Sequence, residues 1–177
     1  MRALFVLGLV AGCGRCVDGA SLADLPSGEW RGFDVEALPG WEGPPVYGSP
    51  ARSTIADING PGVALFDADL DGNLDLYVGQ GGTVARAAAG KGAAPDRFFL
   101  GDGGGGFVEA TASWGMDQRC WSQGVAVGDV DADGDPDLFV ACLGRDALLR
   151  NDRGAWTDVS ESAGLAGPEG WSASAAF

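Results

Sequence analysis

Two short stretches of the chain are near copies of each other, and each carries four carboxylates within nine residues. The first loop runs over 67–75 and the second loop over 129–137, both in the pattern D-x-D-x-D-G-x-x-D between β-forming apolar residues. Two like charges about 5 Å apart repel by roughly 1 kcal/mol in water and by several times that near a protein surface. Each loop is therefore hard to hold folded without a cation.

The chemistry of the ligands indicates which cation each loop binds. Oxygen ligands without His or Cys select Ca²⁺ or Mg²⁺ over transition metals, and a flexible loop crowded with carboxylates favours Ca²⁺. We expect side-chain oxygens from positions 1, 3, 5 and 9 and a backbone carbonyl from position 7. The predicted structural cofactor is Ca²⁺, about two per chain. The predicted ligand positions are Asp67, Asp69, Asp71, Asn73, Asp75, Asp129, Asp131, Asp133, Asp135 and Asp137.

An EF-hand and a metal-free acidic turn are two other interpretations of the loops. An EF-hand needs a Glu at position 12 and helices on both sides, but position 12 is Val78 or Val140 here and the flanks are typical of strands. A solvated acidic turn without metal is the other interpretation, and two copies in matching context argue against it.

The loops belong to a longer repeat. Residues 62–66 align with 124–128 at an offset of 124 − 62 = 62, and 107–111 align with 156–160 at an offset of 156 − 107 = 49. The difference is mostly an insertion over 79–95, rich in Gly and Ala, which we expect to be an exposed loop. A period of about 50 residues is typical of solenoids and propellers.

Each unit is predicted to form four antiparallel strands, which is one blade of an all-β propeller. A helical turn over Ala110–Trp114 is expected to close the first unit, and a third unit is expected to begin at Trp171, where Trp121-Ser122 recurs as Trp171-Ser172. The predicted strands are 63–66, 74–78, 97–101 and 107–111 in the first unit and 125–128, 137–142, 147–151 and 156–160 in the second.

The pattern D-x-D-x-D-G-x-x-D-L with Gly-Val-Ala before it resembles the FG-GAP or VCBS repeat of integrin-α-like β-propellers. Residues 97–116 and 151–165 resemble the repeat junction of the cartilage acidic protein and UnbV-type subfamily. The resemblance covers about residues 60–177 and implies Ca²⁺ in the loop between the first two strands of a blade. Because such propellers have about seven blades, two blades and the start of a third predict a fragment of a larger propeller. Ring formation by short chains is the alternative.

The N-terminus resembles an export signal. Residues 1–12 consist of Met1-Arg2 and ten largely apolar residues, and a short apolar segment of this length is typical of a signal peptide. Cys13 ends a stretch that resembles a bacterial lipobox, so we expect a lipoprotein with Cys13 lipidated, while ordinary cleavage after small residues stays open. Residues 13–50 are predicted to be a flexible tether. The propeller part then spans 51–177, with repeat 1 over about 60–120, repeat 2 over 121–170 and the start of repeat 3 over 171–177.

Export makes disulfides available. Cys120 precedes the strand entering the second loop and Cys142 ends the strand leaving it, so a hairpin brings them near each other. A Cys120–Cys142 bridge and two small buried thiols are equally compatible with this spacing.

Charge and composition limit the functions of the chain. The formal net charge is −14 and there is no His. The acidic balance argues against nucleic acid as a partner and against membrane contact except through a lipid anchor, and the lack of His excludes histidine-based catalysis. We expect an exported, surface-anchored, non-catalytic module that binds an extracellular protein or carbohydrate. The alternative is the non-catalytic part of a larger secreted enzyme, such as a polysaccharide-degrading one.

Overall fold

The computed structural model describes residues 60–83, 93–116, 118–165 and 170–177. The predicted signal peptide, the predicted tether and Cys13 lie outside these residues. The described residues contain strands and turns but no helix, and none of them forms a helix long and apolar enough to cross a membrane. The all-β prediction is therefore confirmed for this part of the chain.

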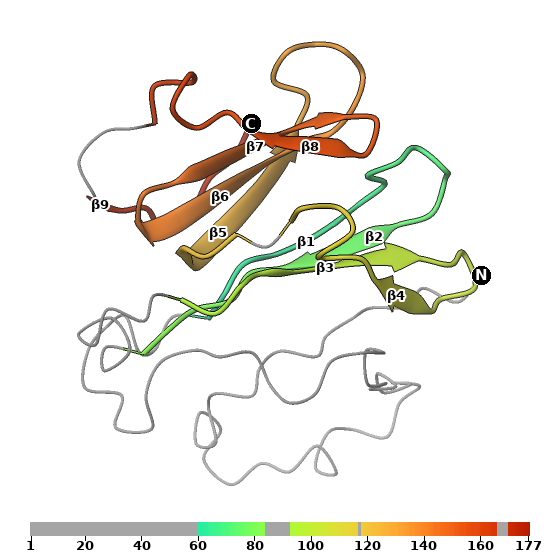
Figure 1. The fold of residues 1–177 in the computed structure, drawn as a ribbon, viewed down its shortest axis with the longest axis horizontal. Coiled ribbons are helices and arrows are strands. Elements are labelled where there is room, and N and C mark those ends of the chain that lie inside the picture. The colour runs from blue at the N-terminus through green and yellow to red at the C-terminus, as the bar shows by residue number, and fades with distance from the viewer. Residues whose placement is uncertain (1–59, 84–92, 117, 166–169) are drawn as a thin grey trace, which may run out of the picture. The chain divides into compact units, whose positions relative to one another are not determined.

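The first sheet contains four antiparallel strands in chain order (Figure 1, green to olive). Its strands are β1 (Val63–Phe66), β2 (Asp75–Val78), β3 (Arg97–Gly101) and β4 (Phe107–Glu109). β1 and β3 match the predicted ranges. The first loop connects β1 to β2, and Phe66 pairs with Asp75 across its base.

The second sheet repeats this order and adds a short fifth strand beside β6 (Figure 1, gold to red). Its strands are β5 (Trp121–Gly128), β6 (Asp137–Gly144), β7 (Ala147–Asp152), β8 (Ala155–Asp158) and β9 (Gly170–Trp171). β5 begins four residues before the predicted start at 125, because Trp121 pairs with Leu143 and Ser122 with Cys142. A bulge between Ser122 and Gly124 joins this early part to the rest of the strand.

A single helical turn follows the last strand of the first unit, as the sequence predicts. β4 ends at Glu109 instead of residue 111 because Thr111 uses its side chain, whose Oγ1 accepts from the Phe98 amide at 2.9 Å. The Trp114 amide then donates to the Ala110 carbonyl at 3.0 Å.

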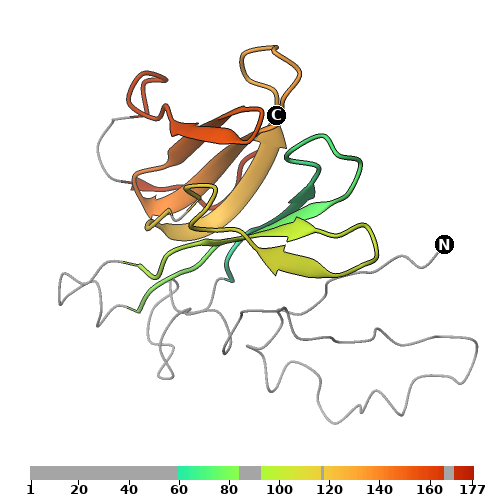
Figure 2. The ribbon, with the colours of Figure 1, turned by 45° about the vertical axis from the view of Figure 1, so that its right-hand side comes forward.

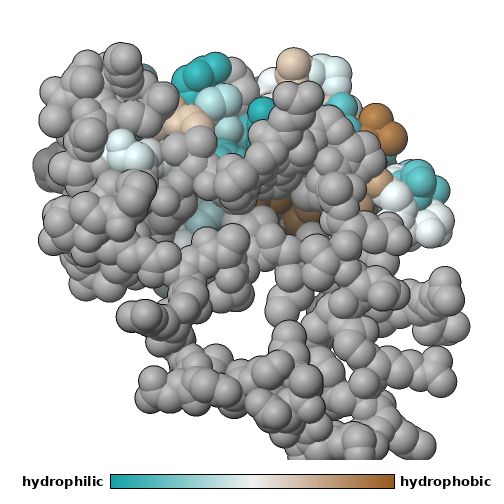
Figure 3. Space-filling model, turned by 90° about the horizontal axis from the view of Figure 1, so that it is seen from below, coloured by the Kyte–Doolittle hydropathy of each residue, from teal (hydrophilic) through white to brown (hydrophobic). Residues whose placement is uncertain are grey.

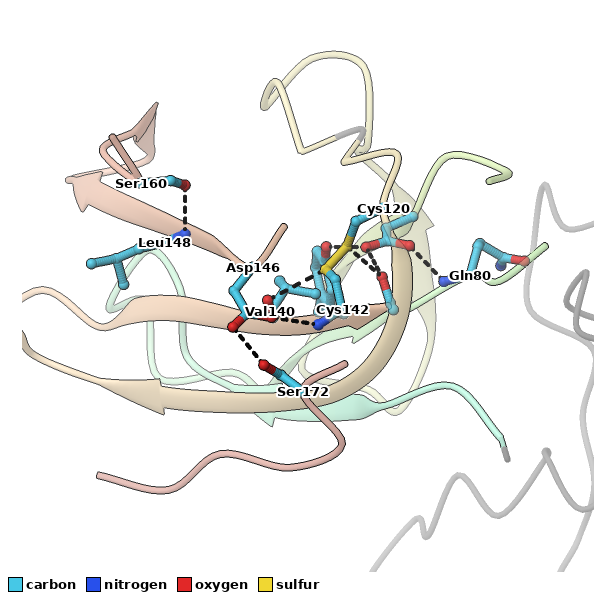
Figure 4. Close-up of a disulfide and its surroundings, with 11 residues drawn as sticks. Gln80, Cys120, Val140, Cys142, Asp146, Leu148, Ser160 and Ser172 are labelled. Atoms are coloured by element: carbon cyan, nitrogen blue, oxygen red, sulfur yellow. Dashed lines mark hydrogen bonds between the residues drawn. A yellow bond between two sulfur atoms is a disulfide. The ribbon is translucent and has the colours of Figure 1, made fainter. Parts of the chain in front are cut away.

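The second unit reproduces this turn. The Leu148 amide donates to Ser160 Oγ at 2.9 Å (Figure 4), and the Ala163 amide donates to the Val159 carbonyl at 2.9 Å. The repeat seen in the sequence is therefore also a repeat of hydrogen bonds.

A shared apolar core lies between the two sheets, which face each other in Figure 2. Phe66 is central to this core, with its ring centroid 6.2 Å from that of Trp156 in an edge-on contact. Burying one large apolar side chain stabilises a fold by about 1.5–3 kcal/mol. The buried members of the core are Phe66, Ala68, Tyr77, Phe98, Ala110, Met116, Leu138, Val140, Cys142, Ala147 and Leu149.

Glycine lets the first strands of successive units approach each other closely. A Cβ added to Gly62 would lie 2.7 Å from Val125 Cγ2, and one added to Gly124 would lie 3.0 Å from Ser174 Cα. Contacts this short leave no room for a side chain. The segment after Trp171 therefore runs beside β5 as β5 runs beside β1, in the position expected for the start of a third unit.

The prediction of an exposed loop over 79–95 is wrong at its beginning, where residues 79–82 are buried. The Gly79 amide donates to the Gly62 carbonyl at 2.9 Å, and the Gln80 carbonyl accepts from the Ser122 amide at 2.9 Å. These backbone bonds hold the segment between the two units. Residues 84–92 lie outside the described part.

A buried aspartate hydrogen-bonds across the junction of the two units. Asp96 accepts from Ser122 Oγ at 2.7 Å, from the Gln80 amide at 2.5 Å and from the Tyr77 hydroxyl at 2.6 Å. Burial raises the pKa of this carboxyl to about 7, although the three donors oppose the shift. Burial, and then the Asp96 carboxyl, raise the pKa of the Tyr77 phenol well above its ordinary value.

Asp146 repeats this junction 50 residues later (146 − 96 = 50). It accepts from Ser172 Oγ at 2.7 Å and from the Cys142 amide at 2.8 Å (Figure 4). The recurring Trp-Ser pair of the sequence thus supplies the serine that bonds back to the preceding unit. The residue at the repeat position of Tyr77 is Phe139 (139 − 77 = 62), which has no hydroxyl to add.

Candidate metal centre

Three predicted ligands of the first loop come together. Asp67, Asp69 and Asp71 each offer a carboxylate oxygen, and these oxygens lie within 4.8 Å of one another. Asp69 and Asp71 are exposed and Asp67 is half-buried. Three negative oxygens at this spacing repel each other strongly, and a hard cation among them removes the repulsion.

Backbone amides shape the first loop around its first carboxylate. Asp67 accepts from the Asp71 amide at 3.0 Å and from the Gly72 amide at 2.9 Å. Gly72 has a φ of 90°, which a side chain disfavours, and Leu70 has a φ of 59°. The glycine at position 6 therefore turns the chain, and the residue at position 4 also has a left-handed conformation.

The second loop has the same internal geometry. Asp129 accepts from the Asp133 amide at 3.2 Å and from the Gly134 amide at 3.0 Å. Gly134 has a φ of 97° and Ala132, at position 4, a φ of 62°. The two loops thus adopt the same conformation in different surroundings. The motif itself therefore determines this conformation.

Carboxylates of the second loop gather in two overlapping groups. Oxygens of Asp129, Asp131 and Asp137 lie within 4.8 Å of one another, as do those of Asp131, Asp133 and Asp152. Reduced contact with water, and then the charge of Asp133, raise the pKa of Asp131.

Asp152 was missed by the sequence analysis because it lies outside the second loop in the sequence, as the last residue of β7. Arg150 also reaches this side of the loop, with Nη2 2.8 Å from the Asp152 carboxylate and Nε 3.8 Å from that of Asp131.

In the first unit the residue equivalent to Asp152 is Asp102 (152 − 102 = 50), whose carboxylate accepts from the Gly104 and Gly106 amides at 2.8 Å each. These amides lower the pKa of Asp102. The signal in the sequence was the recurrence of Asp at this repeat position.

The last aspartate of each loop is buried and ties the loop to its sheet. Asp75 is 1% exposed and accepts from the Ala68 amide at 2.8 Å and the Gly101 amide at 2.9 Å. Burial raises the pKa of Asp75, and its two amide donors oppose that effect. Position 9 therefore has a structural role besides the predicted one as a ligand.

Asp137 has the equivalent arrangement in the second loop. It is 0% exposed and accepts from the Val130 amide at 2.7 Å and the Asn151 amide at 2.8 Å. Asp137 also belongs to one of the carboxylate groups of its loop. The same carboxylate can therefore clamp the loop and face a cation.

Position 7 differs between the loops. Asn73 donates to Asp71 from its backbone amide at 2.7 Å and from Nδ2 at 2.9 Å. The Asp135 amide donates to Asp133 at 2.9 Å, while its buried carboxylate accepts from the Arg153 amide at 3.1 Å. Both side chains are thus engaged within the protein, which leaves the backbone carbonyl as the predicted ligand.

Cys120 and Cys142 form a disulfide in the structure, with their Cα atoms 5.8 Å apart (Figure 4). The bridge joins the residue before β5 to the middle of β6. It lies beside the junction of the two units, because Cys120 Sγ is 3.5 Å from Ser122 Oγ.

The view in Figure 3 shows apolar, brown atoms of the described residues only in small, separate areas. Acidic side chains of both loops are exposed, among them Asp69, Asp71, Asp131 and Asp133. The carboxylate groups of the two loops can therefore bind a hard cation through oxygen ligands.

The comparisons with known proteins agree with this geometry. Residues 67–140 match the family model of the FG-GAP-like repeat, from the first residue of the first loop to beyond the end of the second loop. No curated protein matches the chain. The match and the two four-strand units support an FG-GAP repeat protein with blades of the propeller type.

Proposed function

We propose that the chain is a calcium-binding propeller module in which one Ca²⁺ in each loop staples its blade and the module acts as a non-catalytic binding protein. One observation carries the proposal. Each loop holds three carboxylate oxygens within 4.8 Å of one another, on a backbone that its own amide bonds and left-handed residues already shape. Such a loop is stable at neutral pH when a cation offsets the repulsion.

The ligand chemistry favours Ca²⁺ over Mg²⁺. Residues Asp67, Asp69 and Asp71 would hold the first ion, with the carbonyl of Asn73. In the second loop Asp129, Asp131 and Asp133 would hold the ion, with Asp137 and the carbonyl of Asp135. Ca²⁺ accepts six to eight oxygen ligands in flexible geometry, whereas Mg²⁺ demands a tight octahedron and gives up its water reluctantly.

The ion would serve as structural support. Each loop joins the first two strands of its blade, so an ion that holds the loop also holds the strand pair. Binding to the folded state alone stabilises by RT ln(1 + [L]/Kd), about 2.7 kcal/mol per site at a hundredfold excess over Kd.

We also propose that the module works outside the cytoplasm, with an extracellular protein or carbohydrate as its partner. The apolar residues 1–12 and the lipobox-like Cys13 support export as a surface lipoprotein. The Cys120–Cys142 disulfide suits an oxidising compartment. The net charge of −14 disfavours nucleic acid and anionic lipid as partners.

A calorimetric Ca²⁺ titration of the full chain, with Mg²⁺ as the competing ion, tests the metal assignment. We expect two Ca²⁺ per chain, one in Asp71→Ala, one in Asp133→Ala and none in the double variant. Glu161→Gln is the matched control, since it removes one exposed carboxylate outside the loops and should retain two ions. Two ions bound by the double variant would show that the ligand assignment is wrong.

A further inference from the structure

The side chain of Asn151 is buried between the two loops and hydrogen-bonds to both. It is 0% exposed. Its Nδ2 donates to the Ala68 carbonyl of the first loop at 2.8 Å and to the Pro136 carbonyl of the second loop at 3.2 Å. Its Oδ1 accepts from the Gly154 amide at 2.7 Å. Every polar atom of this side chain is therefore engaged.

A continuous series of hydrogen bonds passes through Asn151 from one loop to the other. The Ala68 amide donates to Asp75 at 2.8 Å, and the Ala68 carbonyl accepts from Asn151 Nδ2. The Asn151 amide then donates to Asp137 at 2.8 Å. The series thus joins the last carboxylate of the first loop to the last carboxylate of the second.

Ala68 stands between two of the carboxylates that gather in the first loop. Because Asp67 and Asp69 are its chain neighbours, a cation that fixes them also fixes the Ala68 peptide. If that peptide moves, Asn151 loses an acceptor for a buried N–H, which costs free energy because water cannot replace the acceptor.

We infer that Asn151 couples cation binding at the two loops, so that an ion in one loop tightens binding in the other. The inference rests on the proposed function. Asn151 acts here as a positioning residue, because it holds the Ala68 carbonyl and the Asp137 carboxylate in place and need not touch an ion. The repeat position in the first unit is Gly101 (151 − 101 = 50), which keeps the amide bond to Asp75 but has no side chain.

The coupling is measured by Ca²⁺ calorimetry on the full chain. Asp133→Ala reports the affinity of the first loop alone, and Asp71→Ala that of the second loop alone. The overall affinity of the native chain for two ions, divided by the product of these two affinities, is the coupling factor. We expect a factor of at least about 5, the low end of typical allosteric coupling, and by linkage it acts equally in both directions.

Substitutions at Asn151 then assign the coupling to its side chain. Asn151→Gly gives the second unit the residue of the first, and Asn151→Asp retains the size but replaces the N–H donors by an acceptor. In each variant, remeasured with the same loop substitutions, the factor should fall to about 1. Leu149→Ala is the control, since Leu149 is buried on the same strand but belongs to the apolar core. It should lower the melting temperature and retain the factor.

Each outcome decides the proposal. A native chain that binds two Ca²⁺ with a factor of 1 overturns the coupling and leaves the proposed function standing. A chain that binds no Ca²⁺ in either loop overturns both. A factor retained in both Asn151 variants, or lost equally in Leu149→Ala, overturns the role of Asn151. Loss in Asn151→Asp alone suffices to support it if Asn151→Gly fails to fold.

Discussion

The two loops share a motif and a set of internal hydrogen bonds but have different neighbours. At position 2 of the first loop, Ala68 is 1% exposed and packs in the core between the sheets. At position 2 of the second loop, Val130 is 40% exposed. The residue before the loop also differs, since Phe66 packs on Trp156 whereas Gly128 has no side chain.

The difference shows that successive units support each other in one direction. The second unit packs on Ala68 of the first loop and supplies Asn151 to it, whereas only the beginning of a following unit, residues 170–177, lies beside the second unit in the described part of the chain. The motif thus determines the conformation of a loop, and the next unit determines how firmly that loop is held.

The largest expected effect comes from removing the aromatic side chain that precedes the first loop. Phe66→Ala should lower the free energy of unfolding by about 3–5 kcal/mol, because it leaves a cavity beside Phe98 and Trp156. Urea unfolding followed by circular dichroism measures this. Val108→Ala, at a side chain that is 62% exposed, should change stability by less than about 0.5 kcal/mol. Equal losses in the two variants would contradict the described packing.

The second prediction concerns the junction between the units and its dependence on pH. The pKa of Asp96 is raised from 3.8 to about 7, so the folded chain retains this proton over a range in which the unfolded chain has released it. The tighter proton binding of Asp96 in the folded chain therefore stabilises the fold fully below pH 4. This stabilisation is lost as the pH rises to 7, and the free energy of unfolding falls by up to about 1.4 kcal/mol per pH unit.

Asp96→Asn cannot titrate and removes this dependence. Urea unfolding of both proteins in chelator, from pH 4 to 8, gives the difference between their free energies of unfolding. That difference should change between pH 4 and 7 in favour of the variant and then level off. A difference that stays constant over the whole range would argue against a raised pKa.

The third prediction separates the structural role of position 9 from its role as a ligand. Asp75→Asn and Asp137→Asn each replace a carboxylate oxygen that accepts a backbone amide by a donor, which should cost about 1–3 kcal/mol. Because the bonds are internal, the loss should appear in chelator as well as in Ca²⁺. Urea unfolding under both conditions measures it. If the loss occurred only in Ca²⁺, the two residues would be ligands and not clamps.

The smallest effects are expected when the residues at position 2 of the two loops are exchanged. Ala68→Val overpacks a buried site and should cost at least about 1 kcal/mol. Val130→Ala changes an exposed site and should shift stability by less than about 0.5 kcal/mol. Thermal unfolding of the two variants compares them directly. Equal sensitivity at the two positions would mean that the second loop is covered as the first is.

Local features of the fold could be predicted because they depend on short-range patterns. Short apolar runs predicted β1 and β3, and the glycine at position 6 lies at the turn of each loop. The clusters of Asp67, Asp69 and Asp71, and of Asp129 and Asp131, follow from their spacing on one turn. The motif and its repetition were therefore enough to predict these strands, turns and carboxylate clusters.

The contacts between units could not be predicted, because they join residues far apart in the chain. Asp96 bonds to Ser122 across 26 residues, and Asn151 bonds to Ala68 across 83. No periodicity marks such pairs before the two sheets have packed. The burial of residues 79–82 was likewise mistaken for exposure, because a Gly-rich composition resembles a surface loop.

The sequence by itself determined the all-β class, the two-unit repeat and most of the carboxylates that gather in each loop. The all-β class and the carboxylate groups follow from short apolar runs and turn chemistry, which act within about ten residues, and the repeat follows from the recurrence of the motif. Only the tertiary structure decided which loop is covered, that Asp152 joins the second carboxylate group and that Asn151 links the loops. Those outcomes depend on how one sheet packs against the next, since burial and hydrogen bonding between distant residues arise only when the packing excludes water.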